Sequence, residues 1–289
     1  MSGADYFEHD GLDFCFQKAG EGVPFIFLHG LGGNLSQPFG VFFPPPGICL
    51  ICLDARAHGR TRPLGAPEKV KISVMAEDAR ALMDHLGLAR AVVGGISMGA
   101  AVALNFALRF PERAAGLVLS RPAWLDAPRP ENTRVFAEIA KLLRERGAKE
   151  GMEAFRKSDV YAELRRESPD CAISACGQFL EPRAVEAVVR LEQIPWDKPC
   201  ESRDEWRRLG MPVLVMANRL DPIHPFEYGE ILAGLIPGAE FGELTPKSVS
   251  VEAYQRDNQR HLARFLTAHF CNPTQAPPDF SQAGTHSIL

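Results

Sequence analysis

A G-x-S-x-G motif at residues 95–99 is the first pattern in this sequence that could do chemistry. The apolar segment 91–96 leads into it and predicts a strand, whereas the apolar segment 98–110 predicts a helix that ends at Pro111. A sharp strand-to-helix turn exposes a serine hydroxyl above the edge of a sheet, and small residues allow the backbone to pack closely there. The N-terminus of the following helix favours developing negative charge. Ser97 is therefore the candidate nucleophile.

Asp221 and His224 are the candidate partners of this serine. The apolar segment 213–217 predicts a strand, and Asp221 follows it at the edge where catalytic residues of open α/β sheets gather. A serine hydroxyl needs an adjacent base to become a good nucleophile, and histidine titrates near neutral pH. His224 lies three residues after Asp221 and could supply that base. It could equally hydrogen-bond its own turn, and Asp221 could be a plain turn residue.

Short apolar strands alternate with helical stretches around these residues. Segments 25–28, 48–53, 91–96 and 117–119 predict strands in the first half of the chain, and 213–216 resumes the pattern. Strands that are apolar throughout and separated by helices indicate a mostly parallel sheet covered on both faces. The predicted fold class is therefore α/β.

The chain divides into a core, an insertion and a tail. Residues 122–209 show helical periodicity without a convincing strand, which predicts a helical insertion into a core made of residues 1–121 and 210–271. Within the insertion, 151–166 and 183–193 are predicted to be helical. A closing helix is expected from about 251 to 268, and the tail 272–289 has the composition of a disordered segment.

These segments resemble the α/β-hydrolase family over about residues 10–270. The motif at 95–99 resembles its nucleophile elbow, and His29-Gly30-Leu31-Gly32-Gly33 resembles its H-G-x-G oxyanion loop. Residues 54–61 are similar to its D-x-R-G-H-G-x-S segment, and 218–225 fits its acid loop with asparagine in place of glycine. The helical insertion 122–209 lies where the family inserts its cap.

The resemblance implies a role for several of these residues. Ser97 would be the nucleophile, Asp221 the acid, and the N–H groups of Leu31 and Met98 the oxyanion hole, whereas the histidine of segment 54–61 would be structural. In the family the base is a histidine that follows the last strand. The corresponding loop here, 243–250, has no histidine, and the position expected for the base falls near Lys247 or Ser248.

Three alternatives follow from the absence of a histidine in this loop. His224 could supply the imidazole from the acid loop. Lys247 could act as the base if burial lowered its pKa towards neutrality. The site could also have lost turnover and only bind a ligand or a partner. The remaining histidines near this end, His261 and His269, lie in the closing helix and are predicted to be surface residues.

The resemblance implies an enzyme that hydrolyses an ester, thioester or lactone of a small, partly apolar molecule through an acyl-enzyme. No metal or organic cofactor is expected. Arg121 and Trp124, after the fourth strand, and His29, in the oxyanion loop, are candidates for contact with the substrate. Acyl transfer and C–C bond cleavage are alternatives within the family. A ligand-binding homologue without catalysis is the alternative of a different class.

Composition excludes several other functions. The 289 residues are 46% hydrophobic and 24% charged, with a formal charge of −4 and no Lys/Arg block that would indicate a nucleic-acid site. No apolar run reaches the ~18–20 residues of a membrane span, and the polar, acidic start argues against a signal peptide. The seven scattered cysteines indicate apolar thiols in a reducing cytoplasm, because Cys49 and Cys52 would point to opposite faces of one strand. Whether the chain forms a homodimer stays open.

Overall fold

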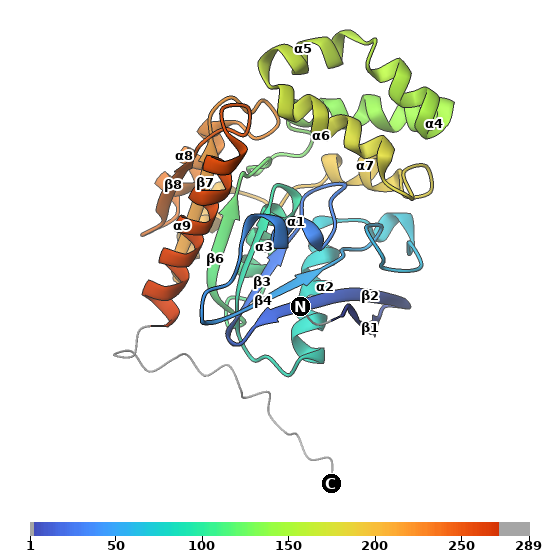
Figure 1. Ribbon diagram of the computed structural model, residues 1–289. Coiled ribbons are helices and arrows are strands. Elements are labelled where there is room, and N and C mark those ends of the chain that lie inside the picture. The colour runs from blue at the N-terminus through green and yellow to red at the C-terminus, as the bar shows by residue number, and fades with distance from the viewer. Residues whose placement is uncertain (1–2, 272–289) are drawn as a thin grey trace.

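The computed structural model describes residues 3–271 (Figure 1). The tail 272–289, predicted to be disordered, lies outside the described residues. Within the described part, eight strands form one sheet in the order β1-β2-β4-β3-β5-β6-β7-β8. The pairs from β4 onward in this order are parallel, whereas the pairs β1–β2 and β2–β4 are antiparallel. The strands are β1 (Asp5–His9), β2 (Leu12–Gly20), β3 (Gly22–Leu28), β4 (Gly47–Leu53), β5 (Ala91–Ile96), β6 (Ala114–Ser120), β7 (Val213–Asn218) and β8 (Glu240–Leu244).

Both faces of the sheet are buried, as the apolar strands predict. Along β3, Ile26 and Leu28 belong to one hydrophobic core, whereas Phe25 and Phe27 belong to the other. Alternate side chains of a strand point to opposite faces, so a strand covered on both sides must be apolar at every position. One core contains α2 (Ile72–His85), α3 (Met98–Arg109) and α8 (Phe226–Leu235), and the other contains α9 (Val251–Phe270) and the residues around α1 (Ser36–Val41).

The first two strands and α8 are not among the predicted elements. Strands β1 and β2 form an antiparallel hairpin at the edge of the sheet, and β2 also pairs with β4. Their polar positions, such as Gln17 and Lys18 in β2, interrupt the apolar runs that marked the central strands. An edge hairpin with one face open to water carries a weaker hydrophobic pattern than a buried parallel strand.

Between β6 and β7 the described chain contains helices and turns but no strand. The helices are α4 (Arg134–Phe155), α5 (Asp159–Glu167), α6 (Pro169–Leu180) and α7 (Val189–Gln193). Short 3-10 turns lie at Glu131–Thr133, Ile194–Trp196 and Arg203–Arg208, and one more precedes α2 at Pro67–Lys69. Helices α4 to α7 form a layer over one end of the sheet (Figure 1). The predicted helix 183–193 is shorter in the structure, because turns occupy the residues before Val189.

The described residues contain no disulfide, no cluster of metal ligands and no membrane-spanning helix. All seven cysteines are free thiols, and Cys52 is buried inside β4 whereas Cys49 is partly exposed. Among residues 3–271, no group of three or more His, Cys, Asp or Glu side chains is arranged to hold a metal ion. No helix in that same range has both the length and the apolar composition needed to cross a membrane.

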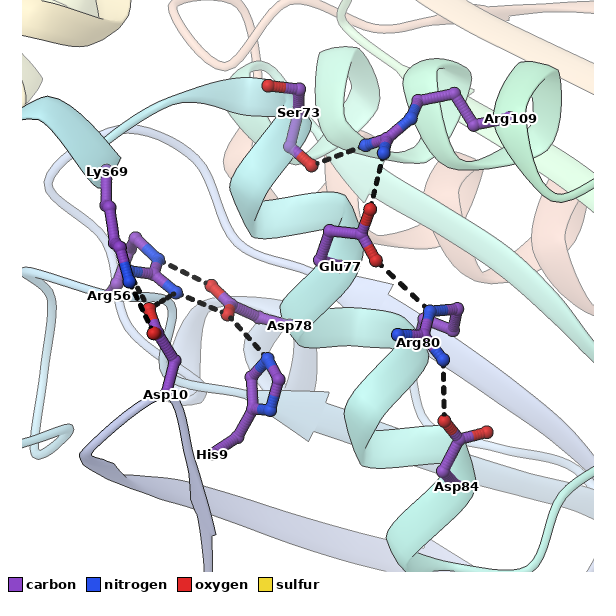
Figure 2. A network of polar contacts seen from close by, with 10 residues as sticks. All are labelled: His9, Asp10, Arg56, Lys69, Ser73, Glu77, Asp78, Arg80, Asp84 and Arg109. Carbon is purple, nitrogen blue, oxygen red and sulfur yellow. Dashed lines mark hydrogen bonds and ion pairs between the residues drawn. The ribbon is translucent and has the colours of Figure 1, made fainter.

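A buried ion pair fastens the loop after β4 to α2. Arg56 donates from Nε and Nη2 to the two carboxylate oxygens of Asp78, at 2.7 and 2.6 Å, and both side chains are 1% exposed. Figure 2 shows this pair with Asp10, which contacts Arg56 and Lys69 at the edge of the network. The pair holds the segment that carries His58 against the core.

Replacing Asp78 by asparagine is expected to lower the free energy of unfolding by about 3–5 kcal/mol, because Arg56 would lose its buried partner and keep only the partly exposed Asp10. Urea unfolding followed by circular dichroism measures this loss. The matched control is Glu77→Gln on the same helix, where the salt bridges to Arg80 and Arg109 are partly exposed. The control should cost about 1 kcal/mol or less. Equal losses in the two variants would contradict the prediction.

Candidate active site

Ser97 lies at a strained turn between β5 and α3. Its backbone has φ 56° and ψ −110°, a conformation that is costly for a residue with a side chain and that marks functional turns. A Cβ added to Gly95 would lie 2.1 Å from the carbonyl carbon of Gly99, and one added to Gly99 would lie 2.4 Å from the oxygen of Leu28. Only glycine fits at both positions. The Ser97 N–H donates to the oxygen of Ser120, which ties the turn to β6.

The loop after β3 holds one peptide group in a defined orientation. The carbonyl of Gly30 accepts hydrogen bonds from Nδ1 of His29, at 2.8 Å, and from the N–H of Gly33, at 2.9 Å. Because the peptide is planar and trans, the N–H of Leu31 points the opposite way. The N–H of Met98 belongs to the first turn of α3, where helix N–H groups have no partner inside the helix. These two N–H groups are available to an oxyanion.

Asp221 and His224 lie in contact after β7. The His224 Nδ1 atom is 3.0 Å from each carboxylate oxygen of Asp221, and the His224 N–H donates to Oδ1 at 3.1 Å. Both residues are buried. Because Nδ1 is used in this contact, Nε2 is the ring nitrogen left for a substrate or a nucleophile. The pair has the composition of the acid–base half of a catalytic triad.

Two further side chains contact the carboxylate of Asp221. Arg121 donates from Nε and Nη2 to Oδ2, at 3.0 and 2.5 Å, and Cys171 donates from Sγ to Oδ1 at 3.2 Å. The Arg121 Nη2 atom is also 3.1 Å from Nδ1 of His224. The carboxylate is therefore paired with a buried guanidinium as well as with the imidazole.

These charges shift the pKa values of the pair. Burial alone would raise the pKa of Asp221, but the charges of Arg121 and His224 hold it well below its ordinary value. Burial lowers the pKa of His224; Asp221 opposes this effect, and the positive charges of Arg121 and Lys247 add to it. His224 is therefore neutral near pH 7, which is the state a general base requires.

A small cavity of about 80 Å³ joins these groups. Ser97, His224 and Lys247 all line it, and Leu31 of the oxyanion loop lies beside them. The Lys247 ammonium is 4.7 Å from the centre of the Tyr254 ring. The other side chains around the cavity come from the core loops and from the helical layer: Gln37, Ile96, Arg121, Phe136, Asp170, Cys171, Ser174, Ala175, Gln178 and Ile223.

His29 and Trp124 lie away from this cavity. Both are almost fully buried, and neither is among its lining residues. His29 uses both ring nitrogens on the backbone, because Nδ1 donates to Gly30 and Nε2 accepts the N–H of Ala55 at 3.1 Å. Arg121 does line the cavity, but its guanidinium is engaged with Asp221.

Cys171, Gln178 and Gln37 reach the site although the sequence offered no sign of it. Gln37 accepts the N–H of Gly30 at 2.7 Å, and Gln178 donates to the oxygen of Leu31 at 3.0 Å. Cys171 and Gln178 belong to α6, whose apolar periodicity marks a packed helix but not which residues face a site. No local pattern could have identified them.

Replacing Arg121 by glutamine is expected to raise the pKa of His224. The substitution removes a positive charge from Nδ1 and leaves the Asp221 carboxylate free to stabilise the imidazolium. Protonation of His224 would then begin at a higher pH, and an NMR titration of the imidazole measures the change. Arg219→Gln, which removes an exposed arginine paired with Glu243, is the control and should leave the pKa of His224 unchanged. A pKa that falls in Arg121→Gln would contradict the prediction.

Comparison with known proteins shows the family of this chain. The sequence model of the alpha/beta hydrolase fold family matches residues 23–248. A 2-hydroxy-6-oxo-6-phenylhexa-2,4-dienoate hydrolase of Comamonas testosteroni is 36% identical over 128 residues, which cover 42% of this chain and 44% of that protein. A 3-oxoadipate enol-lactonase of Acinetobacter baylyi is 26% identical over 209 residues, 72% of this chain and 74% of that protein.

The solved structures extend the likeness to the fold. The enol-lactonase from Burkholderia xenovorans LB400 superimposes with a TM-score of 0.67 at 23% identity, over 91% of this chain and all of that one. The chain spans less than half the length of the first curated relatives that it matches. The family match covers most of the sequence and agrees with the mostly parallel eight-stranded sheet. The chain belongs to the α/β-hydrolase fold family.

Proposed function

We propose that this protein is a serine hydrolase that cleaves an ester, thioester or lactone of a small, partly apolar molecule. The observation that carries the proposal is the placement of Ser97, at a strained turn, in one cavity with His224 and Leu31. Hydrolase activity is also named for the relatives from Comamonas testosteroni and Acinetobacter baylyi.

The proposed reaction uses the groups of this cavity in order. His224 Nε2 takes the proton from Ser97 Oγ as the oxygen attacks the substrate carbonyl. The N–H groups of Leu31 and Met98 bind the oxyanion, and each such donor lowers the barrier by roughly 3–4 kcal/mol. The tetrahedral intermediate collapses, and His224 gives the proton to the leaving alcohol or thiol. Water, activated by the same imidazole, then hydrolyses the acyl-enzyme.

The helical segment 122–209 is proposed to act as a cap that selects the substrate. Phe136 and Ala175 from this segment, with Ile223 from the acid loop, give the cavity an apolar wall. A volume of about 80 Å³ suits a small acyl group. These features support a compact, partly apolar substrate.

Two observations favour alternatives at the same site. Lys247 lines the cavity with Ser97, so a Ser–Lys arrangement is the second candidate for the base. Arg121 neutralises Asp221, which reduces its ability to stabilise a protonated His224, and this favours a protein that binds a ligand without turnover. Acyl transfer and C–C bond cleavage would use the same serine.

A panel of ester, thioester and lactone substrates tests the proposal, together with labelling by a fluorophosphonate probe. Turnover of at least one class, with the probe found on the peptide that contains Ser97, is the expected result. If no substrate turns over while a member of the panel protects Ser97 from the probe, the binding alternative replaces the proposal. Labelling elsewhere with Ser97 unmodified would refute both.

A further inference from the structure

A second and larger cavity, of about 530 Å³, lies between the core and the helical segment; we call it the arginine cavity. The core side consists of residues 32–36 and of residues in the loop after β4, and the other side consists of residues between 181 and 190. Ser97 does not line it. Leu31 lines the Ser97 cavity, and Gly32, which follows it in the chain, lines the arginine cavity. At this boundary Gln178 donates a hydrogen bond to the carbonyl of Leu31. The two cavities are adjacent and share no lining residue.

Arg190 is the unusual residue of the arginine cavity. It is 2% exposed, and only its Nη1 atom has a partner, the oxygen of Ala187 at 2.9 Å. Its Nε and Nη2 atoms are buried without any hydrogen-bond partner, and no carboxylate of the described residues lies within 4.0 Å. Burial lowers the pKa of Arg190 to about 10, so the group is still charged near pH 7. A buried charge of this kind is costly unless something pairs with it.

Among the other charged groups around the cavity, Glu181 attracts the Arg190 guanidinium, which partly opposes the effect of burial on the pKa of Arg190, but no hydrogen bond joins the two side chains. Arg183 uses Nε and Nη2 on Glu186 and Nη1 on the oxygen of Thr61. The Asp54 carboxylate accepts the N–H groups of Leu35 and Arg60. Four arginines line the cavity, Arg60, Arg62, Arg183 and Arg190, against two carboxylates, Asp54 and Glu181. The lining therefore carries an excess of positive charge, which attracts an anion.

A second buried group in the same lining also has no partner. His58 Nε2 is buried and unpaired, whereas Nδ1 contacts the oxygen of Arg56 at 2.9 Å and so carries the proton. Burial holds the pKa of His58 well below its ordinary value, so Nε2 is a hydrogen-bond acceptor. Arg190 and His58 thus line one cavity from different segments of the chain, and each has buried polar atoms without a partner. Such a lining fits a polar occupant.

We propose that the arginine cavity binds a small organic carboxylate through the Nε/Nη2 edge of Arg190. These two adjacent N–H groups form the fork that matches both oxygens of a carboxylate. The site does not depend on the reaction proposed for Ser97. The carboxylate can belong to a separate molecule or to the far end of a molecule bound at Ser97, and the chemistry of recognition is the same in both cases.

Calorimetric titration of the full chain with phenylacetate and with its neutral isostere phenylacetamide tests this site. The wild type should bind phenylacetate and should bind phenylacetamide far more weakly. Arg190→Gln should weaken phenylacetate binding by about 30-fold or more, the scale for losing one partner of a buried charge pair. Arg190→Lys keeps the charge without the fork and should also bind more weakly than the wild type. Glu181→Gln, which removes a lining carboxylate, should bind at least as tightly as the wild type.

The thermal stability of each variant shows whether a loss of binding is only a loss of fold. Arg190→Gln removes an unpaired buried charge, so its melting temperature without ligand should be no lower than that of the wild type. Binding that persists after Ser97 has been labelled by the fluorophosphonate identifies a separate molecule as the ligand. If the label abolishes phenylacetate binding in otherwise folded protein, phenylacetate occupies the Ser97 cavity, and the proposal is overturned. Equal binding of phenylacetate by Arg190→Gln and the wild type, or no binding to the wild type, would overturn the proposal.

Discussion

Ser97→Ala is expected to lower turnover by about 10⁶-fold, the scale for losing the nucleophile of a serine hydrolase. In the proposed reaction the alanine removes the oxygen that would form the acyl-enzyme, and the oxyanion donors cannot replace it. The backbone hydrogen bond from residue 97 to Ser120 remains, so the melting temperature should change by no more than a few degrees. Steady-state kinetics and thermal unfolding of the same preparation measure both effects.

Ser174→Ala is the matched control for this substitution. Ser174 lines the same cavity from α6, and its hydroxyl carries no role in the proposed reaction. Turnover should stay within a fewfold of the wild type, and fluorophosphonate labelling should be complete. Labelling that survives in Ser97→Ala but is lost in Ser174→Ala would show that the nucleophile has been misassigned.

Replacing His224 by alanine or glutamine is expected to lower turnover by about 10³-fold or more, because the serine loses its base. The unprotonated ring is the active form, so activity should fall as pH drops through the pKa of His224. Burial and Arg121 keep that pKa below the ordinary 6.5, and the acid limb of the pH–rate profile should therefore have its midpoint below pH 6.5. The glutamine variant keeps much of the side-chain volume and separates the chemical loss from a packing defect.

Lys247→Met is the control that distinguishes the two candidate bases. The methionine keeps an unbranched apolar stem beside Tyr254 and removes the ammonium, and turnover should change by less than about tenfold if His224 is the base. The double variant of His224→Ala with Ser97→Ala should cost little beyond Ser97→Ala alone, because residues that act together are not additive. High activity in His224→Ala combined with its loss in Lys247→Met would assign the base to Lys247.

The strands and helices that are marked by a local pattern of apolar residues and glycines could be predicted from the sequence. The strand, turn and helix around Ser97 follow from apolar runs and two glycines, and the strand before Asp221 follows from the run 213–217. The hairpin of β1 and β2 was missed, because an edge strand alternates with polar residues and lacks the continuous apolar run. The turns before Val189 were predicted to be helical, because their apolar residues have helical spacing.

The partners of the candidate acid could not be predicted in this way. Arg121 lies 100 residues before Asp221 in the chain, and Cys171 lies 50 residues before it, yet both contact its carboxylate. The sequence marks Arg121 only as a residue after a strand and Cys171 only as a member of a helix. Their meeting depends on β6 and β7 being neighbours in the sheet and on α6 packing over that edge.

The sequence by itself determined the α/β class, the strand-to-helix turn at Ser97 and the loop after a strand that carries Asp221, because each depends on residues close together in the chain. The spacing of apolar residues, a glycine at a tight turn and the end of a strand are local properties of the chain. They can therefore be identified from the sequence. Only the tertiary structure decided that Asp221 is paired with Arg121, that Lys247 shares a cavity with Ser97, and that Arg190 is buried without a partner. The reason is physical: charge pairing and burial depend on distances between segments, and these distances exist only after the sheet and the helical layer have packed together.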